Sequence, residues 1–368
     1  MKRLTIRQIL VPIDFSEMSI EAIPPAKNLA RRFNASVQLV HVHWFDYPAG
    51  FTALPGPVPG WSTVQEEVER SLAARLQEVA SKFELPPANC HLCTGAPVFD
   101  EISRLAQELP ADLIVTSTHG YGGLKHFFLG STAERLVQHA PCPVLVSRKG
   151  RATIDKILVP VDFSRCSLEG LKYAIQFAEQ FAAKVFILHA VCLGEPHTSD
   201  GFAIYDLSAL EKKGRKNTEQ QMLRFVRQVK FGRVKFETVV KTGHPTDHIN
   251  AFAEKERIDL IITSTHGRTG FKHALMGSTA EQVVRRALCS VLVVPSHPEI
   301  RTRHLVGSDQ ELSAPDAQSC ATPGTQAQAS GSRATHEKIS QSERARFTGA
   351  PADEQISRIA RVSKVRCH

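Results

Sequence analysis

The stretch ILVPIDFS at residues 9–16 returns almost unchanged as ILVPVDFS at residues 157–164. A longer pair follows, with STHGYGGLKHFFLGSTAE at residues 117–134 and STHGRTGFKHALMGSTAE at residues 264–281. The two pairs are offset by 148 and 147 residues, which is the length of a whole domain rather than of a solenoid repeat. The sequence therefore predicts two domains of one fold in tandem.

Apolar runs alternate with amphipathic segments in each repeat, which is typical of a parallel sheet covered by helices on both faces. We expect strands near residues 7–13, 36–43, 89–94, 112–117 and 143–147, and again near 156–161, 184–191, 234–241, 259–264 and 290–294. We expect helices near residues 17–33 and 62–83, after Pro97, and near residues 131–138, and again near 167–181, 207–229, 245–255 and 278–287. The domains are predicted at residues 1–149 and 152–296, joined by a very short linker.

The composition changes after residue 296, where Ser, Ala, Gln, Thr, Gly and Arg dominate and aromatic residues almost vanish. Such a segment buries too little apolar surface to offset its ordering entropy, so residues 297–368 are predicted to form a disordered tail. No window approaches 18 apolar residues, and the N-terminal residues lack an apolar leader segment. We therefore expect no membrane span and no signal peptide, and a cytoplasmic protein.

The formal net charge is +8, with basic residues interspersed among acidic ones and no nucleic-acid-binding signature. We therefore expect no specific nucleic-acid binding. Of the eight cysteines, only Cys90 and Cys93 have metal-like spacing. If they lie on one strand, the two thiols point to opposite faces. No second CxxC completes four zinc ligands, so we expect no metal site.

Asp14 and Asp162 stand at the carboxyl ends of the first predicted strand of each repeat. Ligands of open α/β sheets bind outside those ends. A carboxylate there can accept hydrogen bonds from a nucleotide's ribose or base edge, or it can cap the helix that follows. Position alone favours neither role.

The glycine-rich loops lead to Ser131 and Ser278 at predicted helix N-termini, where backbone N–H groups favour phosphate. Glu134 and Glu281 each follow the serine by three residues, which is the spacing of a capping box, so a well-capped helix is the alternative. Neither a P-loop nor a dinucleotide fingerprint is present. The loop histidines have no nucleophile–base partner of clear spacing, so no catalytic residue is predicted.

Together these residues resemble the universal stress protein family in tandem form, over about residues 6–295. The resemblance rests on the two opening motifs, on the loops, and on the closing motifs APCPVLV (residues 140–146) and ALCSVLVV (residues 287–294). It implies a Rossmann-like parallel sheet of five strands in the order 3-2-1-4-5 in each domain. Dimers of the family pair through strand 5, so the resemblance implies an intrachain pseudo-dimer here.

The family's ATP-binding pattern, G-x2-G-x9-G-[ST], is matched in both repeats except at its first glycine. Ser117 and Ser264 stand in that place and put a side chain where the backbone would approach the nucleotide, which predicts weaker ATP binding than the full pattern gives. The resemblance implies nucleotide contacts in the first repeat from Pro12, Ile13, Asp14, Val42, Ser117, Gly120, Gly130, Ser131 and Thr132. In the second repeat it implies contacts from Pro160, Val161, Asp162, Ala190, Ser264, Gly267, Gly277, Ser278 and Thr279.

The predicted function is a stress-response module that binds ATP, alone or with Mg²⁺, as a sensor or regulator with little or no catalysis. The alternative is a nucleotide-free protein-interaction scaffold whose loop helices are merely capped. A third hypothesis is an ATP-dependent enzyme of a related α/β superfamily. The lack of a metal-binding carboxylate pair and of a clear base in the motifs argues against that third hypothesis.

Overall fold

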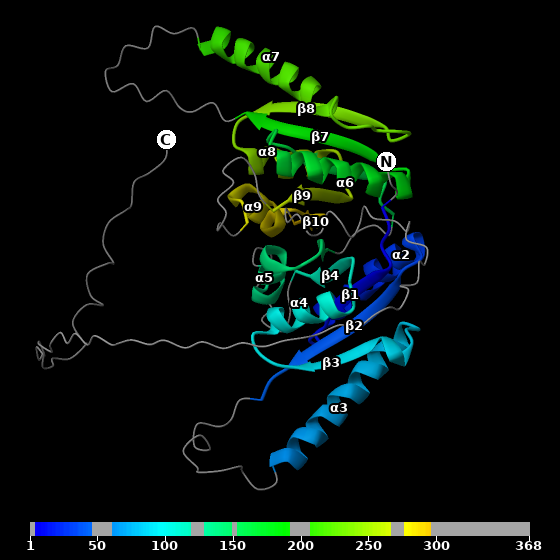
Figure 1. The fold of residues 1–368 in the computed structure, drawn as a ribbon. Helices are drawn as coiled ribbons and strands as arrows, with labels where there is room; N and C mark the ends of the chain where they lie inside the picture. The colour runs from blue at the N-terminus through cyan, green and yellow to red at the C-terminus, as the bar shows by residue number, and fades with distance from the viewer. Residues whose placement is uncertain are drawn as a thin grey trace, which may run out of the picture. The chain divides into compact units, whose positions relative to one another are not determined.

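The first half of the chain alternates strands with helices, as Figure 1 shows. Its strands are β1 (Gln8–Pro12), β2 (Ser36–His43), β3 (Cys90–Thr94), β4 (Leu113–Ser117) and β5 (Val144–Ser147). Its helices are α1 (Glu17–Ile20), α2 (Ile23–Phe33), α3 (Trp61–Lys82), α4 (Val98–Glu108) and α5 (Ser131–His139), with a short 3-10 turn, η1, at Pro87–Asn89.

The second half repeats this order. Its strands are β6 (Lys156–Pro160), β7 (Lys184–Val191), β8 (Phe236–Thr242), β9 (Leu260–Ser264) and β10 (Ser290–Val294). Its helices are α6 (Arg165–Phe181), α7 (Leu207–Val226), α8 (Pro245–Lys255) and α9 (Ser278–Arg286).

The computed structural model describes residues 4–45, 61–118, 129–148, 153–191, 207–265 and 276–295, and for 207–213 the backbone alone. The predicted tail (297–368), residues 149–152 of the predicted linker (149–153) and the loop glycines Gly120 and Gly267 lie outside the described residues.

Within the described residues, ten strands form one sheet in the order β3-β2-β1-β4-β5-β10-β9-β6-β7-β8. Each half contributes five parallel strands in the order 3-2-1-4-5, so the predicted tandem α/β fold is confirmed. At the centre, β5 and β10 pair antiparallel, with Leu145 opposite Leu292.

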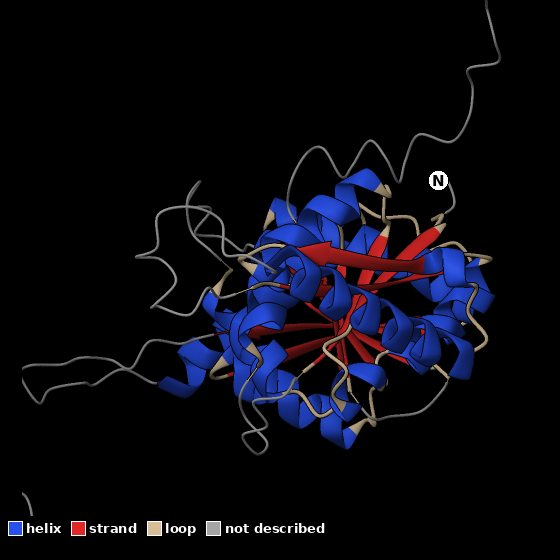
Figure 2. Cartoon of the chain, turned by 90° about the horizontal axis from the view of Figure 1, so that it is seen from below, coloured by secondary structure: helices blue, strands red, loops and turns tan. Residues whose placement is uncertain are grey.

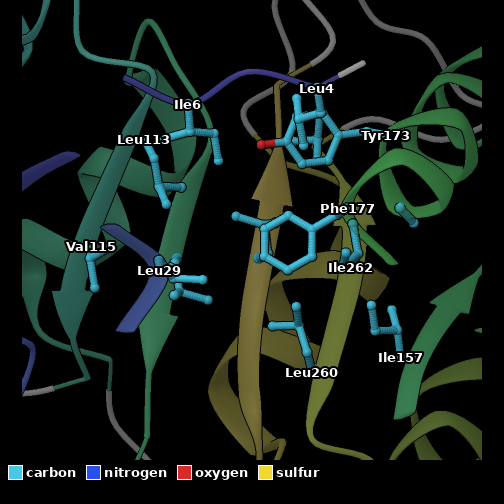
Figure 3. Packing of buried hydrophobic residues seen from close by; sticks show 14 of the residues in the cluster. Leu4, Ile6, Leu29, Leu113, Val115, Ile157, Tyr173, Phe177, Leu260 and Ile262 are labelled. Carbon is cyan, nitrogen blue, oxygen red and sulfur yellow. The ribbon is translucent and has the colours of Figure 1, made fainter. Parts of the chain in front are cut away.

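Helices lie on both sides of the strands (Figure 2). Each side of the sheet therefore has its own apolar layer. One layer packs α2, α3, α6 and α7 against the strands and includes Leu29, Leu76, Phe177 and Phe225, and Figure 3 shows part of it. The other layer packs α4, α5, α8 and α9 against the opposite side and includes Ile102. Both layers contain residues of both halves, so the core runs through the junction between them.

The single helix predicted over residues 17–33 is two helices in the structure. α1 ends at Ile20, and α2 starts at Ile23 with Pro24 in its first turn. A proline lacks the N–H that a continuing helix needs but fits a first turn, which explains why the helix restarts here. The equivalent α6 contains no proline and runs unbroken from Arg165 to Phe181.

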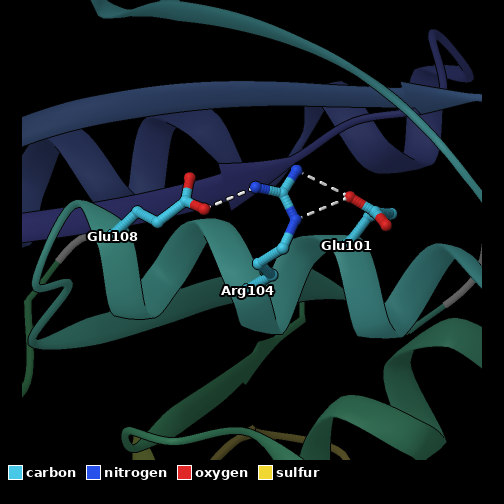
Figure 4. Close-up of polar contacts among 3 residues, drawn as sticks. All are labelled: Glu101, Arg104 and Glu108. Carbon is cyan, nitrogen blue, oxygen red and sulfur yellow. Dashed lines mark hydrogen bonds and ion pairs between the residues drawn. The ribbon is translucent and has the colours of Figure 1, made fainter.

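The outer face of α4 carries an ion network (Figure 4). Arg104 pairs with Glu101 on one side and with Glu108 on the other, at the spacings where helix neighbours meet. The inner face of the same helix buries Ile102 in the layer that contains Val42 of β2. The apolar face of α4 therefore packs on the side of the sheet where Val42, a predicted site residue, lies.

The predicted opposite orientation of Cys90 and Cys93 is confirmed. Cys90 packs against the layer of α2 and α3, and Cys93 packs against the layer of α4 and α5. Burial raises the pKa of both thiols, so both are protonated at neutral pH.

Candidate functional site

The two opening motifs form matching turns at the ends of β1 and β6. The Ile13 N–H donates to the Val40 carbonyl at 2.9 Å, and the Val161 N–H donates to the Leu188 carbonyl at 2.8 Å. Both side chains are buried in the layer of α2 and α6. Of these two predicted site residues, only the backbone is therefore placed at the strand end. Asp14 and Asp162 come directly after them in the chain.

The aspartates organise the turn but do not cap the helix. Asp14 Oδ1 accepts from the Ser16 N–H at 3.0 Å and from its hydroxyl at 2.5 Å, and Asp162 Oδ1 accepts from the Ser164 N–H at 3.0 Å. The serines are the N-cap residues of α1 and α6, where their side chains accept from the N–H three residues on. The capping role considered for the aspartates is therefore wrong, since it falls to these serines.

A phenylalanine between each aspartate and serine holds the turn in a rare conformation. Phe15 and Phe163 both have φ of 62°, in the left-handed region that non-glycine residues seldom adopt. Their rings lie 4.3 Å from the His41 ring and 4.1 Å from the His189 ring, centroid to centroid. The repeated strain and stacking fix the direction in which each aspartate leaves the strand.

His41 and His189 tie the second strand of each half to this turn. His41 Nδ1 donates to the Ile13 carbonyl at 2.8 Å, and His189 Nδ1 donates to the Val161 carbonyl at 2.7 Å. Burial lowers the pKa of His41, which favours the neutral ring at pH 7. The sequence motifs did not predict a role for these histidines. A histidine at the same position in the second strand of both repeats could have indicated one.

The predicted apolar contacts lie on the other side of the sheet. Val42 is buried in the layer of α4 and α5, whereas Ala190, its equivalent, is only partly buried against the same layer. Pro12 and Pro160 end β1 and β6 half-buried. By strand alternation they share this side, because Leu10 and Leu158 two residues earlier belong to its layer.

The serines that replace the family's first glycine face away from that side. A Cβ on Gly170 of α6 would lie 3.7 Å from the Ser264 Cβ, so Ser264 packs toward α6. Ser117 is buried, and by alternation it shares its side with Leu113 and Val115 of the α2 layer. Both side chains thus point to the side opposite Val42.

The glycines that end the two loops are the N-cap residues of α5 and α9. The Gly130 N–H donates to the Thr118 carbonyl and the Gly277 N–H to the Thr265 carbonyl, both at 2.8 Å. These bonds hold each helix start beside the end of β4 or β9. A glycine N-cap has no side chain to accept from the first-turn N–H groups.

The predicted capping boxes are wrong in both helices. Ser131 and Ser278 are the first helical residues and not the caps. Glu134 and Glu281 both pair with Arg285, at 2.7 and 3.1 Å, instead of reaching back to the helix start. Both serines are exposed, and the following Thr132 and Thr279 are half-buried.

The structure brings the two motifs of each half to neighbouring strand ends. β1 pairs with β4 and β6 pairs with β9, so each aspartate turn lies next to the strand whose end holds a glycine-capped helix. In the part of the chain that the structure describes, no group of three or more His, Cys, Asp or Glu side chains could hold a metal ion. None of the described helices is long and apolar enough to cross a membrane.

Fold and site together define a duplicated α/β protein with a ligand-site layout at the carboxyl ends of its parallel strands. A sequence profile of the Universal stress protein family matches residues 5–148 and again residues 153–295. The chain belongs to the universal stress protein family, with two family domains in tandem.

Curated relatives and solved structures agree with this assignment. The chain is 37% identical over 155 residues to universal stress protein MJ0531 of Methanocaldococcus jannaschii, which covers 40% of this chain and 86% of that protein. It is 29% identical over 151 residues to MJ0577 of the same organism, covering 38% and 93%. A universal stress protein structure from Archaeoglobus fulgidus matches the fold with a TM-score of 0.50 at 19% identity, covering 80% of this chain and 98% of that chain.

Proposed function

We propose that each half binds an adenine nucleotide, ATP, at the neighbouring ends of its first and fourth strands. The protein then acts in the cytoplasm as a nucleotide sensor or regulatory module of the stress response, with little or no turnover. The observation that carries the proposal is the glycine N-cap of α5 and of α9, held beside the aspartate turn in both halves.

The helix starts supply the phosphate end of the proposed site. The first-turn N–H groups of an α-helix have no partner within the helix, and the helix dipole places partial positive charge there. Gly130 and Gly277 bring no side-chain acceptor to these groups. Phosphate oxygens are suited to accept from them, with the hydroxyls of Ser131 and Ser278 close by at the first helical position.

The aspartate turns supply the nucleoside end. A carboxylate offers about four acceptor positions, so the bonds from Ser16 orient Asp14 without exhausting its capacity to accept from ribose hydroxyls. Val42 gives the first site an apolar wall for the base. Ala190 gives the second site a smaller wall, so we propose that the first half binds ATP more tightly.

Magnesium enters this proposal only with the nucleotide. Mg²⁺ usually keeps several waters and binds through substrate phosphates together with one or two protein oxygens. The hydroxyls of Ser131 and Thr132, on the first turn of α5, are the oxygens of the described site that would suit it.

We also propose that the two halves, residues 1–149 and 152–296, form one rigid pseudo-dimer through β5 and β10. Three features support it: the antiparallel β5–β10 ladder, the Arg285–Glu134 ion pair, and the apolar layers common to both halves. Arg148 also donates from the end of β5 to the Val284 carbonyl at 2.7 Å.

Native mass spectrometry and titration calorimetry test the nucleotide proposal. We expect the protein purified without denaturation to carry adenine nucleotide, and added ATP to bind with at most two sites per chain. Asp14→Ala and Asp162→Ala should weaken adenosine as well as ATP, because the aspartates serve the nucleoside. If no nucleotide copurifies and ATP gives no binding heat, the interaction scaffold is the better description of this protein.

A further inference from the structure

We propose that the outer edge of the second half binds single-stranded RNA with little sequence preference. The surface runs from the end of α7 to the end of β8, and we call it the basic edge. It is defined by Arg224, Arg227, Lys230, Arg233, Lys235 and Lys241.

The six cations of the basic edge are all exposed. None forms an ion pair with a described residue. The one acidic residue between Arg224 and Lys241 is Glu237, and it pairs with Lys184 of β7 at 2.7 Å. The even mixing of charges expected from the whole sequence therefore does not hold in this segment. Its six cations stand against Glu237 and against Glu179 of α6, whose Oε1 would lie 2.8 Å from a Cβ on Gly232.

The matching edge of the first half is a built-in comparison. Its equivalent segment, residues 76–93, contains three residues of the Asp, Glu, Lys and Arg types, which are Glu78, Lys82 and Glu84. Lys82 pairs with Glu78 at 2.9 Å, and Lys27 of α2 pairs with Glu84 at 3.2 Å. The same place in the same fold thus has no excess of positive charge.

Protection of an open sheet edge does not account for the difference. Lysines on an edge strand discourage pairing with other sheets. β3 and β8 are the two outermost strands of the ten-stranded sheet, and β3 has neither lysine nor arginine. Because β3 is an outermost strand that carries no cations, edge protection does not require the six cations near β8. They point instead to a ligand of opposite charge.

An exposed aromatic ring lies within the run of cations. Phe236 is 43% exposed, and its ring stacks on that of Phe231 with centroids 3.8 Å apart and planes at 17°. The equivalent of Phe236 in the first half is Ala88. Single-stranded nucleic acids bind to such pairings, with phosphates on the cations and a base stacked on the ring, whereas a duplex keeps its bases stacked inside.

The side of β8 that carries Phe236 also favours RNA over DNA. Thr238 and Thr242 share this side by strand alternation and are exposed, so their hydroxyls can bond with ribose 2′-hydroxyl groups. Val240, between them, packs against the layer that contains Phe225 of α7. Figure 1 shows α7 next to β8, so the cations at the end of α7 border the same side.

Fluorescence anisotropy of the full chain with a labelled oligo(U) of about 16 nucleotides tests the proposal. The triple variant Lys230→Ser, Arg233→Ser, Lys235→Ser should weaken binding at least about tenfold and reduce the slope of log affinity against log salt by about 2, because each phosphate contact contributes about 0.7. Phe236→Val should weaken binding about five- to a hundredfold with an unchanged slope. Arg227→Ser, a single exposed change next to the end of α7, should reduce the slope by about 0.7 and serves if the triple variant is poorly folded.

The matched control removes the same charge elsewhere. Arg70→Ser, Lys82→Ser, Lys255→Ser should change oligo(U) affinity less than about twofold. Equal losses in both triple variants, or no loss in the basic-edge variants, would overturn the proposal. Oligo(dU) binding as tightly as oligo(U) would overturn the assignment to RNA. Anionic phospholipid vesicles that bind through these residues, without a matching effect on oligo(U), would assign the surface to membranes instead.

Discussion

Replacing Phe177 with alanine is expected to destabilise both halves of the chain together. Phe177 is 1% exposed, and its ring centroid lies 5.5 Å from that of Phe33 in the first half and 5.0 Å from that of Phe181. Truncating a buried phenylalanine costs about 3–5 kcal/mol, including the cavity that remains. With a urea dependence of about 3 kcal/mol per molar, a loss of about 4 kcal/mol lowers the unfolding midpoint by about 1.3 M.

The natural tryptophans make this a test of cooperation between the halves. Trp44 and Trp61 are the chain's two tryptophans and both lie in the first half, whereas Phe177 lies in the second. Urea unfolding followed by tryptophan fluorescence therefore reports the half that does not carry the substitution, and far-ultraviolet circular dichroism reports both. If the halves unfold as one unit, the two probes give coincident transitions, shifted equally.

A second variant separates cooperation from local contact. The Phe186 ring is 3% exposed and packs 5.5 Å from Phe252 within the second half. Phe186→Ala should also move the tryptophan transition, although both rings of that pair belong to the other half. A tryptophan transition that stays at the wild-type midpoint in both variants would refute the single cooperative unit.

Three further predictions concern the candidate sites. Gly130→Val or Gly277→Val should weaken ATP binding at least about tenfold in calorimetry, because a side chain at the N-cap obstructs the helix N–H groups, while the melting temperature without ligand falls by only about 2 °C. Unchanged ATP affinity would remove the phosphate assignment. Burial lowers the pKa of His41, so at mildly acidic pH the unfolded chain binds a proton more readily than the folded chain does. The free energy of unfolding should therefore fall as pH drops through about 6.5 and level off below the lowered pKa. Urea midpoints measured across this pH range should show a weaker dependence in His41→Asn, with part retained by His91, whose pKa burial also lowers. Ser264→Gly should change ATP affinity less than about twofold, since the side chain faces α6, and a clear gain in affinity would contradict that orientation.

The fold followed from the sequence because its signals are local and occur twice. β7 and β10 begin and end where the runs of β-branched and apolar residues predict. The helix boundary at Ala22 was missed because helical periodicity continues across it, and Pro24 breaks only the hydrogen bonding. Comparing the two repeats with each other located the strands and helices, whereas the strand order 3-2-1-4-5 was expected only from the resemblance to the family.

The details of the site depend on contacts that sequence spacing does not reveal. Glu134 has the spacing of a capping box, yet its carboxylate pairs with Arg285 from the other half of the chain. His41 of β2 donates to the carbonyl of Ile13, which follows the neighbouring strand β1. Ser264 stands in the place of the first glycine of the family's pattern, and its side chain packs toward Gly170 of α6. Each difference arises from packing between elements that are far apart in the chain.

Arg285 also shows what joining two copies in one gene makes available to evolution. In a homodimer with a two-fold axis every contact occurs twice, so both partners must accept the same residue at each position. Here Arg285 bonds Glu134 and Glu281 together, while the residue at its counterpart is Gln138. Two copies of the first half alone would bring glutamates to this junction with no arginine between them. The two halves are therefore complementary at this junction and not interchangeable.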